Sequence, residues 1–169
     1  MNFEQEIINF KNRNKKVELE NNRDIKLLKI KSEGSQFLIF LKMLQCLFDE
    51  TSNDIKVNPQ HPDLFDEKKE LFLIKEKNKN IGIIRYDRNN KSYRILRTFY
   101  IIPEKRNQGI GRIIVKNIEE MTLLENIYSL VLNAESSSQF FYKKLGFNKG
   151  YWKGDRSGSI PYGKNLEKF

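Results

Sequence analysis

Two glycines stand in the run Arg106–Arg112, RNQGIGR, where residue type and spacing suggest chemistry. An apolar, strand-like run from Thr98 to Ile102 precedes them, and a helix-like run from Ile110 to Met121 follows. A helix that starts at a glycine turn presents free backbone N–H groups and the positive end of its dipole. Such a turn suits a pyrophosphate. The sequence therefore predicts an anion-binding turn between a strand and a helix.

Two common phosphate-binding motifs do not fit these glycines. A P-loop needs Lys and Ser or Thr after its second glycine, whereas Arg112 and Ile113 follow Gly111. The dinucleotide fingerprint needs Gly or Ala three residues after Gly111, and Ile114 stands there. The run instead resembles the Arg/Gln-x-x-Gly-x-Gly/Ala signature of the GNAT N-acetyltransferase superfamily. The resemblance implies that this turn grips the pyrophosphate of acetyl-coenzyme A.

A second motif lies downstream, in the run SSSQFFYKKLGF that ends at Phe147. A β-rich run from Leu130 to Asn133 precedes it, and Gly146 is typical of a helix end, so strand, helix and strand are expected. GNAT proteins carry Phe-Tyr-x-x-x-Gly-Phe at this place. The resemblance implies that Tyr142 lies near the thioester sulfur. The two motifs occur in the family's order, and the resemblance covers roughly residues 24–166.

Acetyl transfer to an amine sets the chemical roles to be filled. The thioester carbonyl oxygen needs an N–H donor, and the departing thiolate needs a proton. A tyrosine hydroxyl, with an ordinary pKa near ~10, can supply that proton. Tyr142 is the predicted catalytic residue; the alternative is a packing tyrosine. Direct transfer is preferred because Cys46 lies in an apolar run, where we expect a buried and unreactive thiol.

The resemblance also places the other cofactor contacts. The pantetheine arm is expected to pair with the backbone of the strand before the glycine turn. Asn133 is either a cofactor contact or a turn former, and Ser138 is either a helix cap or a contact. The predicted cofactor-binding residues are Tyr100, Ile101, Ile102, Arg106, Asn107, Gln108, Gly109, Ile110, Gly111, Arg112, Asn133, Ser138 and Phe141.

The general base is missing from the expected place. Many GNAT enzymes carry a glutamate on the strand before the turn, but residues 93–102 contain no acid. His61, Glu70 and Glu104 are the weak candidates, beside a water chain or an acceptor that arrives deprotonated.

The acceptor is expected to be a small cationic amine or a peptide amine, because acids gather in the segment that lines the acceptor side of GNAT folds. These acids are either an attracting rim or simply solvent-facing, and they are Asp49, Glu50, Asp54, Asp63, Asp66 and Glu67. Two other functions stay open. One is a coenzyme A-binding module without turnover, suggested by the missing base, and the other is an RNA-directed acetyltransferase, suggested by the net charge of +9. The lysines are spread along the chain, so nucleic acid is the less favoured partner.

Composition favours one cytoplasmic domain. The chain has 169 residues, a single cysteine and no run as long and apolar as a membrane span. The N-terminus is acidic and unlike a signal peptide. One cysteine allows no intrachain disulfide and no cysteine-based zinc site, and no metal is expected. A homodimer is compatible with the resemblance.

The order of elements predicts an α/β fold. A helix is expected at residues 2–13, within an N-terminal extension of residues 1–23. The domain proper, residues 24–169, is expected to hold strands near 25–30, 71–75, 81–86, 93–102, 129–133, 148–152 and 159–166, and helices near 35–48, 110–121 and 138–145. The resemblance implies three layers around a central mixed, mostly antiparallel twisted sheet, splayed between two parallel strands.

Overall fold

A computed structural model describes residues 23–51 and 54–167; the helix expected at residues 2–13 lies outside them. The strands are β1 (Ile25–Ile30), β2 (Lys69–Glu76), β3 (Lys79–Asp87), β4 (Arg94–Ile101), β5 (Ser129–Ala134), β6 (Asn148–Lys149) and β7 (Ile160–Asn165). The α-helices are α2 (Gly34–Thr51), α3 (Ile110–Leu124) and α4 (Gln139–Lys144), and the short 3₁₀ turns are η1 (Pro62–Leu64), η2 (Pro103–Lys105) and η3 (Ser136–Ser138).

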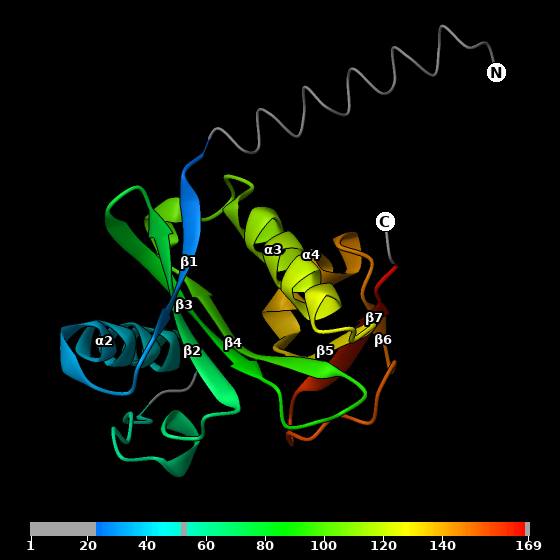
Figure 1. Ribbon diagram of the computed structural model, residues 1–169, viewed down its shortest axis with the longest axis horizontal. Helices are drawn as coiled ribbons and strands as arrows, with labels where there is room; N and C mark the ends of the chain where they lie inside the picture. Colours follow the sequence, from blue (N-terminus) through cyan, green and yellow to red (C-terminus); the bar gives the residue numbers. More distant parts are fainter. Residues whose placement is uncertain (1–22, 52–53, 168–169) are drawn as a thin grey trace, which may run out of the picture.

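The strands form one seven-stranded sheet in the order β1-β2-β3-β4-β5-β7-β6. Each neighbouring pair is antiparallel except β4 and β5, which run parallel. Helix α2 covers one face of the sheet, and α3 and α4 cover the other (Figure 1). The predicted three-layer α/β fold is confirmed.

The two faces follow from the alternation of side chains along the central strands. Leu71 and Leu73 on β2 pack against Phe40 of α2, while Phe72 and Ile74 point to the opposite face and join the cluster that includes α3. Both sets are almost fully buried. A strand with helices on both faces reads as a continuous apolar run, which is why ELFLI lacks alternation.

The sheet opens between its two parallel strands. Only Arg94, Ile95 and Leu96 of β4 pair with β5, opposite residues 130–132. Beyond Leu96, β4 continues to Ile101 and pairs with β3 alone. This opening is the predicted splay, and it leaves backbone groups of β4 without a strand neighbour.

A β-bulge lies where the splay begins. The register of β3 with β4 passes from Arg85 opposite Thr98 to Tyr86 opposite Leu96, so Arg97 is an extra residue in β4. An extra residue sets two successive side chains on the same face. Leu96 and Phe99 belong to the α3 side, and Arg97 and Thr98 both turn to the α2 side.

One prediction about a side chain was wrong. Cys46 is exposed instead of buried. The buried residues of α2 are Phe37, Phe40 and Leu44, at helical spacing along one stripe. Two residues beyond Leu44 correspond to about 200° of helix rotation, which turns Cys46 away from the sheet. An apolar run on a helix that covers one sheet face therefore does not bury every residue in it.

Candidate active site

Two cavities meet at the splay. The first, here called the α3–α4 cavity, measures about 710 Å³ and lies between the turn before α3 and helix α4. The second, the α2 cavity, measures about 650 Å³ and lies between the end of α2, β3 and β4. The residues that line both are Phe99, Ile101, Arg106, Ser137, Ser138 and Tyr142. The arrangement lets one ligand from each side meet between β4 and β5.

The glycine turn shapes one wall of the α3–α4 cavity. Gly109 is the N-cap of α3 and has φ +80°, a conformation that favours glycine. A Cβ atom at Gly111 would lie 3.0 Å from Cζ of Phe141, so only a residue without a side chain leaves this wall open. Arg112 and Lys144 add positive charge around the cavity, and Lys105 also lines it but forms an ion pair with Glu76. The wall fits the predicted pyrophosphate site.

The backbone of Ile101 faces the splay. Ile102 donates its N–H to the Ile81 carbonyl of β3. Since successive strand residues direct their N–H and C=O groups to opposite sides, those of Ile101 point away from β3. The Ile101 N–H therefore faces the splay without a strand neighbour among the described residues, while the Ile101 carbonyl on the same side accepts a hydrogen bond from Arg106.

Tyr142 lies between the cavities and is 8% exposed. Its ring makes edge contacts with the rings of Phe141 and Phe147. Burial raises the pKa of the Tyr142 hydroxyl, and among the described residues none forms a hydrogen bond with it. The hydroxyl is therefore protonated at neutral pH and available to a ligand.

Arg106 does not point into the glycine turn. Its Nε donates to the Ile101 carbonyl at 2.8 Å, and its Nη2 donates to both carboxylate oxygens of Glu50, at 3.0 and 2.8 Å. The guanidinium also lies over the Tyr100 ring, 5.3 Å from its centroid. Arg106 thus occupies a backbone acceptor inside the splay and ties the start of the turn to the end of α2.

Glu50 also accepts a hydrogen bond from the Tyr100 hydroxyl at 3.1 Å. Burial, with the nearby Glu50 carboxylate second, raises the pKa of Tyr100 to about 12. Glu50 lines the α2 cavity, and no pattern in the sequence marks it as different from the acids around it. Its carboxylate contacts the end of β4 through the Tyr100 hydroxyl.

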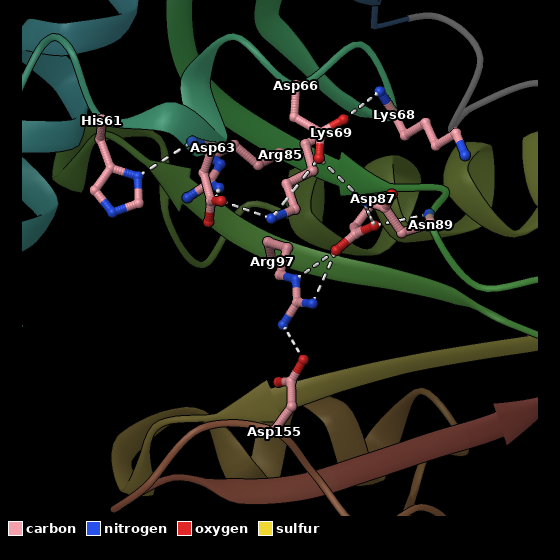
Figure 2. Close-up of polar contacts among 10 residues, drawn as sticks. All are labelled: His61, Asp63, Asp66, Lys68, Lys69, Arg85, Asp87, Asn89, Arg97 and Asp155. Atoms are coloured by element: carbon pink, nitrogen blue, oxygen red, sulfur yellow. Dashed lines mark hydrogen bonds and ion pairs between the residues drawn. The ribbon is translucent and has the colours of Figure 1, made fainter.

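Charged side chains from distant segments line the far part of the α2 cavity (Figure 2). Arg97 lies between Asp87 of β3, at 2.8 Å, and Asp155, at 2.5 Å. Asp155 also accepts a hydrogen bond from Asn133 Nδ2 at 2.6 Å, so it links β4 and β5 where they separate. Although burial opposes it, hydrogen bonds from Asn89 and Arg97 lower the pKa of Asp87.

Known proteins share this fold. A family model described as an acetyltransferase (GNAT) domain matches residues 47–158. This chain belongs to the GNAT acetyltransferase family. No curated protein sequence matches it. In the part of the chain that the structure describes, no helix is both long and apolar enough for a membrane span, and no three His, Cys, Asp or Glu side chains gather as metal ligands would.

Solved GNAT structures share the fold at low sequence identity. Tetrahymena GCN5 superposes with a TM-score of 0.70 at 17% identity, over 86% of this chain and 98% of GCN5. An acetyltransferase from Streptococcus agalactiae gives 0.66 at 22%, over 85% and 99%. The PaiA N-acetyltransferase from Thermoplasma acidophilum, solved with coenzyme A, gives 0.65 at 17%, over 83% and 98%. At these identities the likeness concerns the fold alone.

The residues predicted from the GNAT motifs line the α3–α4 cavity, line only the α2 cavity, or lie outside both. Tyr142 and eight of the predicted cofactor contacts line the α3–α4 cavity, namely Ile101, Arg106, Asn107, Gly109, Gly111, Arg112, Ser138 and Phe141. Tyr100 and Asn133 line only the α2 cavity, and the Oδ1 atom of Asn133 is buried without a partner. The predicted contacts that line neither cavity are Ile102, Gln108 and Ile110.

The remaining candidates fall away from the site. His61 accepts a hydrogen bond from the Asp63 N–H at the start of η1, and Glu70 pairs with Lys29 and Arg88 on the α3 side of the sheet. Neither they nor Glu104 lines either cavity. Of the six clustered acids, only Glu50 and Asp63 line the α2 cavity, and both are engaged by cations. Ser138 stands at the start of α4 but donates to the Glu135 carbonyl instead of capping.

Glu50→Gln is expected to tighten acetyl-coenzyme A binding about two- to fivefold. The substitution releases Arg106 from a partly exposed ion pair, and such pairs stabilise by up to about 1 kcal/mol. Arg106 then turns to the phosphates without first losing a partner. Isothermal titration measures the change, with Asp49→Asn on the same helix as the control. Unchanged or weaker binding by Glu50→Gln would show that Arg106 does not exchange partners.

Proposed function

We propose that this protein transfers an acetyl group from acetyl-coenzyme A directly to a primary amine. The acyl donor follows from the family to which the chain belongs. The observation that carries the finer proposal is the meeting of two cavities at a splayed strand pair, with Tyr142 between them. Two adjoining cavities of this kind suit a donor and an acceptor that react face to face.

The residues present fit the donor. The open wall at Gly109 and Gly111 and the cations Arg112 and Lys144 suit the phosphates. Once Arg106 releases it, the Ile101 carbonyl suits a pantetheine amide N–H. When bound, acetyl-coenzyme A supplies an activated acetyl thioester to the splay. PaiA from Thermoplasma acidophilum, of the same fold, was solved with coenzyme A, which supports this assignment.

The chain's own groups supply the polar chemistry. The Ile101 N–H donates a hydrogen bond to the thioester carbonyl oxygen, whose negative charge grows during attack. The Tyr142 hydroxyl gives its proton to the departing sulfur and is thereby the general acid. Direct attack by the amine needs no protein nucleophile, and Cys46 lines neither cavity.

The general base is proposed to be Glu50. Its carboxylate is the acid in contact with both Tyr100 and Arg106, beside the end of β4. Once Arg106 is drawn to the phosphates, Glu50 keeps only the hydrogen bond from Tyr100 among the described residues, and its carboxylate can accept a proton from the acceptor ammonium. In this proposal, Glu50 at the end of α2 takes the role of the glutamate that many GNAT enzymes carry on the strand before the glycine turn. A cytoplasmic location and the oligomeric state remain predictions from the sequence.

The test is a titration of acetyl-coenzyme A followed by a turnover assay. Micromolar binding, together with release of free thiol when a primary amine is added, supports the proposal. Binding without thiol release on any amine would favour a binding module. A titration that shows no binding of acetyl-coenzyme A would contradict both the proposed acyl donor and the proposed enzymatic activity.

A further inference from the structure

Arg85 is the least exposed of the arginines that line the α2 cavity, and among the described residues it has a single carboxylate contact. It projects from β3 opposite Thr98, on the face to which the bulge also turns Arg97. The cavity wall formed by these residues lies on the acceptor side, beyond the splay. Arg85 is therefore reached by whatever approaches Tyr142 from the side of α2.

The other cations of this cavity are either closely paired or well exposed; Arg156 contacts Glu135 at 3.2 Å but is 58% exposed. Arg97 holds Asp87 and Asp155, and Arg106 holds Glu50. Lys69 binds Asp63 Oδ1 at 2.6 Å. Arg85 has one contact among the described residues, a single Nη2 at 3.3 Å from the other oxygen of the same Asp63. Asp63 is shared between two cations, so Arg85 is the less neutralised of the two.

Burial makes the weak pairing of the Arg85 charge unfavourable. The Arg85 side chain is 17% exposed, and its Nε is buried without a hydrogen-bond partner. Burial lowers the pKa of Arg85 even though Asp63 opposes the change. A guanidinium in this state gains from an added oxyanion, because its planar fork binds two oxygens at once.

Resting on the proposed function, we propose that the amine acceptor also carries a carboxylate, and that Arg85 binds it. Ile101 lies three positions after Thr98 on β4, which corresponds to ~10 Å of strand. Because Arg85 stands opposite Thr98, a carboxylate bound to it lies several bonds from a nitrogen that reacts beside Ile101. An amino acid whose amine and carboxylate lie at opposite ends of a short carbon chain would place the amine beside Ile101 and the carboxylate at Arg85. A polyamine would instead place a second ammonium group against the Arg85 guanidinium. The acceptor class thus differs from the cationic amine expected from the acidic segment.

The experiment compares matched amines. The probes are 4-aminobutyrate and 6-aminohexanoate, each against the alkylamine of the same chain length, with 3-aminopropylphosphonate as a third oxyanion. Each is titrated into the protein with and without saturating coenzyme A. Wild type is expected to bind the carboxylates at least tenfold tighter than their alkylamine partners. Arg85→Gln is expected to abolish the difference and Arg85→Lys to restore part of it.

Arg88→Gln is the matched control. It removes an arginine near the end of β3 that lines neither cavity, and the acids it contacts, Glu70 and Glu125, keep Lys29 and Arg94. Its preference for carboxylates is expected to match that of wild type.

Equal binding of the two members of each pair in wild type overturns the inference. So does no binding of either, tighter binding of the phosphonate, or an unchanged preference in Arg85→Gln. Acetyl-coenzyme A titration and thiol release are measured separately. A protein that binds acetyl-coenzyme A and acetylates both members equally keeps the proposed function and loses only the carboxylate site.

Discussion

Tyr142→Phe is expected to lower kcat about 100-fold, the lower range of general acid catalysis. Phenylalanine keeps the ring contacts with Phe141 and Phe147 and removes only the hydroxyl that would protonate the sulfur. Because no hydrogen bond to a described residue is lost, the free energy of unfolding should change by less than about 1 kcal/mol. Steady-state release of free thiol measures kcat, and acetyl-coenzyme A affinity should stay unchanged.

Tyr86→Phe is the control for this prediction. Tyr86 is fully buried, lines neither cavity, and its hydroxyl hydrogen-bonds Thr122 at 3.0 Å. Loss of that bond should cost stability, about 1 kcal/mol, and leave kcat intact.

The pH profile gives a second check on Tyr142. Burial raises the pKa of Tyr142, so its hydroxyl keeps its proton above the ordinary value near ~10. Wild-type kcat should therefore not fall between pH 8 and 10. A fall in that range, or Tyr142→Phe with kcat within threefold of wild type, would assign the proton to another donor.

Gly111→Val is expected to weaken acetyl-coenzyme A binding at least 100-fold, about 2.7 kcal/mol. A Cβ atom there would lie 3.0 and 3.1 Å from two atoms of the Phe141 ring and 3.8 Å from Ile101 Cδ1. The valine side chain would project from the wall of the α3–α4 cavity and displace the Phe141 ring into the cavity. Backbone N–H groups at the start of α3 would then be shielded from the phosphates.

Two control variants separate the effect of side-chain volume at residue 111 from the effects of a valine in α3 and of a side chain in the glycine turn. Lys116→Val places the same residue at an exposed position on α3 outside the α3–α4 cavity, and its affinity should match wild type. Gly109→Ala adds a small side chain with nothing within 4 Å, but at φ +80°, so it should cost roughly 1 kcal/mol of stability and little affinity. Isothermal titration of acetyl-coenzyme A into the three variants measures these affinities. A dissociation constant for Gly111→Val within threefold of wild type would place the phosphates elsewhere.

The order and type of the elements could be predicted because their signals are local. The first strand was expected at residues 25–30 and β1 has those bounds, and the helix after the glycine turn begins at Ile110 as expected. Apolar periodicity, turn residues and glycine stops act over a few residues. The two motifs likewise placed Tyr142 and the glycine turn, which the structure brings to one cavity.

The polar partners of the site depended on contacts between distant segments. Glu50 and Arg106 are 56 residues apart, and Asp155 reaches Arg97 across 58. No local pattern distinguishes Glu50 from Asp49, or Arg85 from the exposed arginines.

By itself, the sequence determined the element order, the sheet with helices on both faces, and the glycine turn beside Tyr142. The tertiary structure decided that Arg106 turns to Glu50, that Cys46 faces out, and that the bulge at Arg97 brings Arg97 and Thr98 onto the face that carries Arg85. The reason is that periodicity and capping are properties of short segments, whereas a bulge, an ion pair or the burial of one cation depends on which strands and helices pack together.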